Sequence, residues 1–212
     1  MIFFKQFGSV RSFLLASNRL SGKIPSSLGS CVTLAAVNLS WNQFPGSLPG
    51  GILGLSGLRS FGFACQLVGS MNLLSGSIPH TMQKLSLCSY FQHEFNLNFS
   101  VNSLTGLLPL SMGSNVNILA LDFSKNSMSG DLPGWIFKTG SSQVPLSENK
   151  LGAKLSSPIL ASQRTSLQKI QVLDFSHNSF SGEIMNGIGA LTSLQFLNLS
   201  RNSIVAPVSS SD

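Results

Sequence analysis

A short polar phrase returns along the whole chain at near-regular intervals. NRLSGKIPSSLG begins at Asn18, NSLTGLLPLSM at Asn102, NSMSGDLPGWI at Asn126 and NSFSGEIMNGI at Asn178. The asparagine of this phrase recurs at spacings of 24, 30, 30, 24, 23, 29 and 24 residues. The eight positions are Asn18, Asn42, Asn72, Asn102, Asn126, Asn149, Asn178 and Asn202. A repeat of this period indicates an architecture of stacked structural units.

Each copy of the phrase carries the same apolar pattern. Apolar residues stand five and three positions before most of the asparagines, as Leu121 and Phe123 do before Asn126. This alternation predicts a short strand with one buried face. Apolar residues return two and ten positions after the asparagine, here Met128 and Ile136. A single turn cannot bury these side chains, so we expect stacked turns to form one continuous core.

The asparagine has a mechanical explanation. Where the strand turns away, backbone N–H and C=O groups lose their sheet partners, and an inward carboxamide can both donate to and accept from them. Because the asparagine stands in every turn, we interpret the eight positions as a structural ladder rather than as catalytic or ligand-binding residues. A glycine four residues after most of them suits a backbone that needs positive φ or close approach.

Composition and charge exclude several classes of protein. Charged residues make up only 9% of the 212 residues and hydrophobic ones 42%, which disfavours a disordered chain and a typical charged cytosolic enzyme. The net charge of +6 comes from scattered Lys and Arg without a basic run, so we expect no nucleic-acid partner. No apolar run reaches the ~18 residues of a membrane span, and the opening MIFFKQFGSV is interrupted by Lys5, so no signal peptide is clear.

Residues that could carry chemistry are dispersed. Cys31, Cys65 and Cys88 are an odd number without C-x-x-C spacing, which indicates neither a zinc site nor a disulfide framework. We expect Cys31 and Cys88 to be buried thiols, because sister repeats carry Leu there. The three histidines and seven acids fall in unrelated repeat positions. We therefore expect no catalytic residues, no cofactor and no metal.

The pattern L-x-x-L-x-L-x-x-N-x-L followed by S-G-x-I-P-x-x-L-G resembles the plant-specific class of leucine-rich repeats. VLDFSHNSFSGEI and LALDFSKNSMSGDLPGWIF are similar to extracellular repeats of plant leucine-rich-repeat receptor-like kinases. The resemblance implies an α/β leucine-rich-repeat solenoid, a right-handed superhelix with a parallel β-sheet on the concave side and short 3₁₀ or irregular segments on the convex side. It also implies an ectodomain on the extracellular face of the plasma membrane, with any kinase activity in a longer parent protein.

The expected organisation is one repeat domain. Residues 1–10 form a non-repeat N-terminal segment, and 11–212 form about eight turns, with an irregular turn at 138–169 and a truncated last turn. The chain lacks the caps, membrane helix and kinase motifs of the family it resembles, which favours an internal fragment of an ectodomain. Unshielded solenoid ends should make such a fragment less soluble than its parent.

Three of the spacings between ladder asparagines are longer than the others, so the position of the strand that follows each has to be assigned. We place the extra residues after Ile52, Met82 and Ile159, on the convex return path. In the first of these turns Gln66 and Asn72 compete for the ladder position. The SGSIP that follows favours Asn72.

Three functions remain open. The leading hypothesis is a binding module for a peptide or protein ligand, with a co-receptor as a further partner. The alternatives are a truncated or vestigial protein without its own ligand and an extracellular inhibitor of a cell-wall enzyme.

A ligand should contact the outward side chains of the concave sheet. We predict that strand residues four and one before each ladder asparagine face outward there. The sequons N-L-S, N-F-S and N-L-S fall in the first of these rows, either as glycosylation sites of an exported chain or as by-products of the repeat. They are Asn38, Asn98 and Asn198.

Glycans at the sequons would leave the fifth to seventh turns as the longest open stretch. The candidate ligand-binding residues there are Asp122, Lys125, Glu148, Asp174 and His177. Their mixed charge suits a polar or peptide partner whose affinity changes with pH through His177. Trp41 and Met71 form the next surface to consider, and a merely solvated concave face is the alternative.

Overall fold

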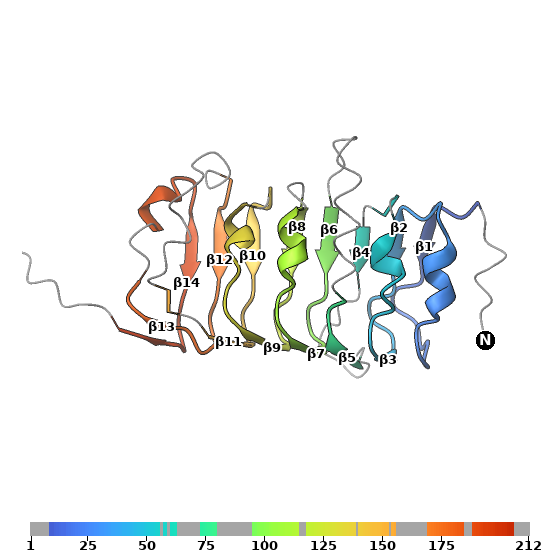
Figure 1. Cartoon of the computed structure of the whole chain (residues 1–212), viewed down its shortest axis with the longest axis horizontal. Coiled ribbons are helices and arrows are strands. Elements are labelled where there is room, and N and C mark those ends of the chain that lie inside the picture. Colours follow the sequence, from blue (N-terminus) through green and yellow to red (C-terminus); the bar gives the residue numbers. More distant parts are fainter. Residues whose placement is uncertain are drawn as a thin grey trace, which may run out of the picture.

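The computed structural model describes residues 9–55, 57–58, 60–62, 73–79, 95–114, 118–138, 140–152, 154–155, 169–184 and 188–205. These residues wind as a solenoid that runs from one end of Figure 1 to the other in sequence order. The architecture confirms the expected leucine-rich-repeat solenoid with parallel strands and few helices.

One strand per turn builds what we call the concave sheet. Its strands are β1 (Ser12–Leu14), β2 (Ala36–Asn38), β4 (Ser60–Gly62), β6 (Phe95–Asn98), β8 (Ile118–Asp122), β10 (Gln143–Pro145), β12 (Val172–Asp174) and β14 (Phe196–Asn198). They pair in parallel in the orders β1-β2-β4-β6-β8 and β10-β12-β14. The backbone N–H of Phe123 donates to the carbonyl of Pro145 at 3.2 Å and joins the two groups.

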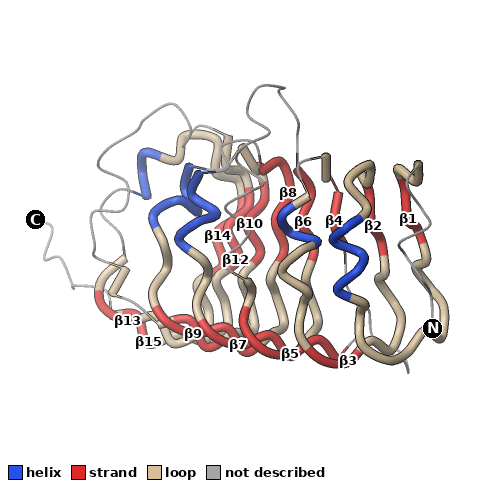
Figure 2. Tube along the Cα trace, turned by 45° about the vertical axis from the view of Figure 1, so that its right-hand side comes forward, coloured by secondary structure: helices blue, strands red, loops and turns tan. Residues whose placement is uncertain are grey.

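A second row of short strands runs along a neighbouring side of the solenoid, at the lower edge of Figure 2. It consists of β3 (Pro45–Gly46), β5 (Leu73–Ser77), β7 (Ser103–Gly106), β9 (Ser127–Gly130), β11 (Lys150–Leu151), β13 (Ser181–Gly182) and β15 (Ser203–Ile204). Short 3₁₀ helices complete the turns: η2 (Ser26–Ser30), η3 (Ile52–Gly54), η5 (Leu110–Ser114), η6 (Gly134–Lys138) and η7 (Ile188–Ala190).

The core lies between these rows, as the apolar pattern predicts. Phe99 and Phe123, each three residues before its asparagine, are fully buried and stack with ring centroids 5.2 Å apart. Ile52 and Ile136, ten residues after theirs, are fully buried as well. Each turn therefore contributes a layer to one hydrophobic cluster. Cys31 is 4% exposed in this core, which confirms its prediction as a buried thiol, while Cys88 lies outside the described residues.

The ladder asparagines join successive turns by hydrogen bonds. The Nδ2 of Asn149 donates to the carbonyl of Phe123 in the preceding turn at 2.9 Å, and its Oδ1 accepts from the N–H of Met128 at 2.9 Å. Asn42, Asn126, Asn178 and Asn202 make the same pair of contacts. One carboxamide thus satisfies a donor and an acceptor that neither sheet reaches. Asn72 lies outside the described residues.

Part of the turn predicted to be irregular is regular. Within residues 140–152 the chain forms β10 and β11, and Asn149 makes the ladder contacts of its neighbours. The inward positions Val144 and Leu146 are apolar and fully buried, so this turn fits the stack. The residue that departs from the repeat motif, Ser156, lies outside the described residues.

The register predicted for the third turn is wrong. β4 pairs Phe61 with Val37 of β2 and with Leu97 of β6, so its strand begins 24 residues after β2 rather than at Leu67. Phe61 occupies the inward strand position because its side chain fills the core layer between Val37 and Leu97. It is only 1% exposed. The extra residues of this turn therefore do not lie between Ile52 and the strand, which corrects their predicted placement.

The second row keeps the frame that the SGSIP motif indicates. β5 begins at Leu73, directly after Asn72, and pairs with β3 and β7. Met82 and Ile159 lie outside the described residues, so the placement of the other two insertions stays a prediction.

Candidate functional site

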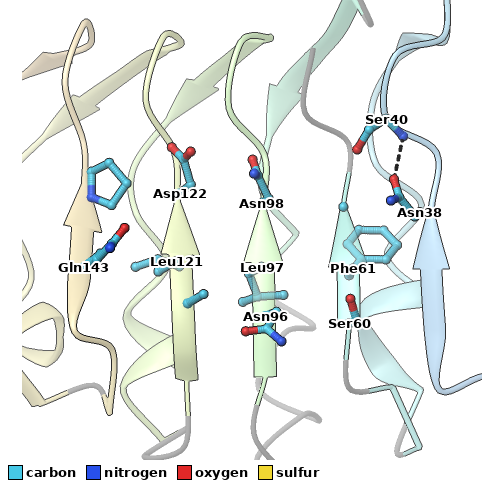
Figure 3. Close-up of a pocket in the computed structure, with 13 residues that line it drawn as sticks. Asn38, Ser40, Ser60, Phe61, Asn96, Leu97, Asn98, Leu121, Asp122 and Gln143 are labelled. Carbon is cyan, nitrogen blue, oxygen red and sulfur yellow. Dashed lines mark hydrogen bonds between the residues drawn. The ribbon is translucent and has the colours of Figure 1, made fainter. Parts of the chain in front are cut away.

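The outward face of the concave sheet carries a polar groove. Side chains alternate along a strand, so the last residue of each strand and the residue two before it point away from the core. Over β2, β4, β6, β8 and β10 they enclose a hollow of about 370 Å³ (Figure 3). The polar side chains that line this groove include Asn38, Ser60, Asn96, Asn98, Asp122 and Gln143.

A glycine provides the room for this groove. The strand register aligns Gly62 of β4 with Asn38 of β2 and Asn98 of β6. β4 therefore ends without the side chain that its two neighbours carry. A Cβ at Gly62 would lie 3.4 Å from Ser40 Oγ and 3.6 Å from Asn38 Oδ1, which is ordinary contact distance. The position therefore accepts a Cβ without a clash.

The residues four before the ladder asparagine end their strands with a side-chain hydrogen bond. The Oδ1 of Asn38 accepts from the N–H of Ser40 at 3.0 Å, as Figure 3 shows. In Asn98 the Oδ1 accepts both from the N–H of Ser100 at 3.0 Å and from its hydroxyl at 2.8 Å. The same bond forms at Asp122, Asp174 and Asn198. An Asx turn of this kind redirects the chain out of the sheet.

The residues one before the ladder asparagine are not strand residues, which corrects the prediction. The concave strands end three residues earlier, and the second outward strand position is instead six before the asparagine. The residues at minus one adopt the left-handed conformation, with φ from 53° to 59°. They are Ser17, Trp41, Val101, Lys125, Glu148, His177 and Arg201, and we call them the turn row.

The structure brings some of the predicted charged residues together. Lys125 Nζ lies 3.4 Å from Glu148 Oε1, with the two side chains 39% and 49% exposed. Asp122 lines the groove, whereas Asp174 on β12 is not part of its lining. Trp41, 46% exposed, belongs to the second turn and stands apart from this pair. Met71 lies outside the described residues.

The groove is lined by hydrogen-bonding groups. Its amides and hydroxyls donate and accept hydrogen bonds, and Asp122 is the single formal charge among its lining residues. Among the described residues, no three His, Cys, Asp or Glu side chains gather closely enough to hold a metal ion. Burial raises the pKa of the Cys31 thiol, which makes that side chain a poor nucleophile. A hollow of this size can hold a small ligand or a part of a larger one.

Sequence comparison relates the chain to plant proteins. Residues 9–31 and 169–191 match the family model described as Leucine Rich Repeat. Receptor-like protein 35 of Arabidopsis thaliana is 30% identical over 170 residues, which cover 80% of this chain and 16% of that protein. Receptor-like protein 32 of the same plant is 31% identical over 195 residues, or 92% of this chain and 21% of that protein. The chain thus spans only about a fifth of the length of these relatives.

Solved structures share the fold. The Arabidopsis receptor kinase HAESA, in complex with the peptide hormone IDA and the co-receptor SERK1, superposes with a TM-score of 0.79 at 30% identity. This match covers 93% of the present chain and 30% of that chain. The ectodomain of the Arabidopsis receptor kinase GASSHO1/SCHENGEN3, in complex with CASPARIAN STRIP INTEGRITY FACTOR 2, gives 0.78 at 30% identity over 93% and 22%. In the described part of the present chain, every helix is too short or too polar to cross a bilayer.

Proposed function

Because this chain is a leucine-rich-repeat solenoid of the plant receptor-like class, we propose that it is part of the ligand-binding ectodomain of a cell-surface receptor. Its ligand is a peptide or a protein, bound in the groove of the concave sheet. In this proposal the longer protein lies at the plasma membrane, with these repeats outside the cell. Any kinase activity belongs to a part of that protein beyond the repeats.

The observation that carries this proposal is the hollow above Gly62. A purely structural sheet needs no break in its row of outward side chains, yet the row Asn38, Gly62, Asn98 and Asp122 is interrupted at one strand. Gly62 is one of the residues that line the hollow of about 370 Å³, a volume within the range of small-ligand sites. Among the described residues, the Nδ2 groups of Asn38 and Asn98 have no hydrogen-bond partner and so are available to a ligand.

A peptide fits the chemistry of the groove. An extended peptide presents backbone N–H and C=O groups that lose water on binding and need partners. The carboxamides of Asn96 and Gln143 supply both donors and acceptors. The similar receptor HAESA was solved with a bound peptide hormone, which supports the same ligand class here.

The charged residues after the strands serve in this proposal as a second contact region. Lys125, Glu148 and His177 belong to the turn row, and Asp174 ends the neighbouring strand β12. They suit a polar extension of the ligand or a co-receptor that covers it. In this arrangement Trp41 contacts the partner at the opposite end of the groove.

The test uses a secreted version of the chain with capping repeats at both ends, freed of N-glycans by an amidase, and a panel of synthetic plant peptide hormones, measured by calorimetry. Gly62→Asn places in the hollow the side chain found at the aligned positions Asn38 and Asn98 and so reduces the space for a ligand. The matched control is Gly189→Asn on η7, a glycine at which an added Cβ would have nothing within 4 Å.

We expect a peptide of the panel to bind the unaltered protein and the control, and to lose at least about tenfold in affinity, roughly 1.4 kcal/mol, with Gly62→Asn. Binding that Gly62→Asn leaves unchanged places the ligand elsewhere, and the triple variant Lys125→Ala, Asp174→Ala and His177→Ala then tests the second region. A panel without any binding peptide contradicts the peptide assignment.

A further inference from the structure

We propose that Asn38 and Asn98 are N-glycosylation sites whose sugars occupy the groove, so that the glycosylated protein and the ligand-ready protein are alternative states. The inference rests on the proposed function only in treating the groove as the ligand site. It assigns to that site a covalent means of regulation.

The position of the sequons leads to this inference. Asn38-Leu39-Ser40 and Asn98-Phe99-Ser100 are the N-x-S tripeptides of β2 and β6, the strands on either side of β4. Both asparagines line the groove, and Figure 3 shows them at the same ends of their strands. The third sequon, at Asn198 on β14, is not part of the groove lining. Two of the three sequons therefore flank the groove strand that ends in glycine.

The Asx turns are compatible with a sugar on the carboxamide nitrogen. The Oδ1 of Asn98 accepts two hydrogen bonds from Ser100, and the Oδ1 of Asn38 accepts one from Ser40. These bonds turn the carbonyl side of each carboxamide toward the chain. Among the described residues, neither Nδ2 has a hydrogen-bond partner, so the nitrogen can carry a substituent without loss of a contact in the turn.

The modification is a transfer from a lipid-diphosphate-linked oligosaccharide. The Asn98 Nδ2 forms a bond to the anomeric carbon of the sugar while the bond from that carbon to the diphosphate oxygen breaks. The bonding electrons leave with the lipid diphosphate, and a base takes one amide proton. Folding then places the first sugars beside Gly62, where their hydroxyls meet the carboxamides of the groove.

The chain contains its own control for this modification. Asp122 and Asp174 make the same Asx turn with serine two residues later, at 2.9 Å and 3.1 Å to the N–H. An aspartate at position 38 or 98 therefore keeps the turn and removes the nitrogen that carries the sugar. Enzymatic release of an N-glycan by an amidase leaves aspartate at the same position, so the genetic and enzymatic routes give the same covalent product.

The experiment compares three forms of the protein secreted from a eukaryotic host: untreated, amidase-treated, and the double variant Asn38→Asp and Asn98→Asp. Mass spectrometry of peptides measures the occupancy of each sequon. Each form also carries Ser60→Cys, which places a thiol in the groove, and the reaction of this groove thiol with fluorescein maleimide is followed by peptide mapping. Leu110→Cys, at a residue that is 81% exposed on η5, provides the control thiol outside the groove.

We expect sugar at Asn38 and Asn98, and a reaction of the groove thiol that is several-fold slower in the untreated protein than in the other two forms. The control thiol on η5 should react at the same rate in all three. Unmodified Asn38 and Asn98 in the secreted protein overturn the proposal, as does equal reactivity of the groove thiol with and without the sugars. Because the assay needs no ligand, its outcome is independent of the peptide-binding test.

Discussion

The Nδ2 of Asn126 donates a hydrogen bond to the carbonyl of Phe99, which lies 27 residues earlier in the preceding turn, at 3.0 Å. Its Oδ1 accepts from the N–H of Leu104 in that same turn, also at 3.0 Å. Phe99 in turn stacks on Phe123 in the core. Polar and apolar contacts thus couple the same two turns. Removal of one contact should therefore lower the free energy of unfolding of the whole protein.

Asn126→Ala should lower the free energy of unfolding by about 1–3 kcal/mol, because a backbone N–H and a backbone carbonyl between the turns lose their partner. Urea denaturation followed by circular dichroism measures the change. The matched control is Asn18→Ala in the first turn, where the exposed carboxamide donates to Leu15 and Ala16 of its own turn. An equal cost for both variants would contradict a role of the ladder in joining turns.

Gly29→Ala should destabilise the convex side. A Cβ there would lie 2.6 Å from the carbonyl carbon of Gly51, and backbone cannot move aside as a side chain can, so we expect a cost of about 1–3 kcal/mol. Gly189 occupies the same repeat position, eleven residues after its asparagine, and has nothing within 4 Å of such a Cβ. Gly189→Ala should therefore be neutral in the same urea melt. Similar losses at both positions would mean that η2 and η3 do not pack this closely.

His177→Val should destabilise the protein through the backbone. His177 has φ near 53°, and a left-handed conformation costs about 1–2 kcal/mol per residue, most severely for a β-branched side chain. His177→Gly removes the Cβ and with it the strain of the left-handed conformation. This gain offsets the larger conformational entropy that glycine loses on folding. Thermal melts should rank glycine close to the unaltered protein and valine clearly below it. The reverse order would show that this residue is not left-handed.

Glu148→Gln tests the ion pair with Lys125. Both side chains are more than a third exposed, so water screens the pair and we expect a change of less than about 1 kcal/mol. The difference between the two proteins should disappear in ~1 M salt, where the Debye length is about 3 Å. A large loss that persists in salt would reveal a structural role beyond this contact.

The features that depend on local pattern could be predicted from the sequence. Inward positions such as Leu121 and Phe123 follow from alternation, and stacking of like turns places them in one core. The register of β4 could not be predicted, because Phe61 and Leu67 both fit a strand locally and only pairing with Val37 and Leu97 decides between them. Because the register of β4 also fixes the position of Gly62, the groove could not be predicted either.

Other parts of the site had weaker or no signals. The Asx turns could have been found, since Asn or Asp with serine two residues later recurs at the strand ends, as at Asp122 and Ser124. The left-handed turn row has no such signal, because residues as different as Trp41 and Glu148 occupy it in place of Gly or Asn. There the hydrogen bonds of the surrounding turns impose a conformation that the side chains do not favour. Three of the predicted charged residues, Lys125, Glu148 and His177, belong to this row and therefore lie beside the strands. The other two, Asp122 and Asp174, end strands β8 and β12 as predicted.

Hydrogen exchange with and without a bound peptide tests the central claim most directly, because it reports where on the solenoid the ligand lies. With a peptide from the panel that binds, we predict slower exchange at Ser60–Gly62, Phe95–Asn98 and Ile118–Asp122, and unchanged exchange at η5 and η6 on the convex side. Protection confined to the convex helices, or to β13 and β15, would contradict the assignment of the concave groove as the ligand site.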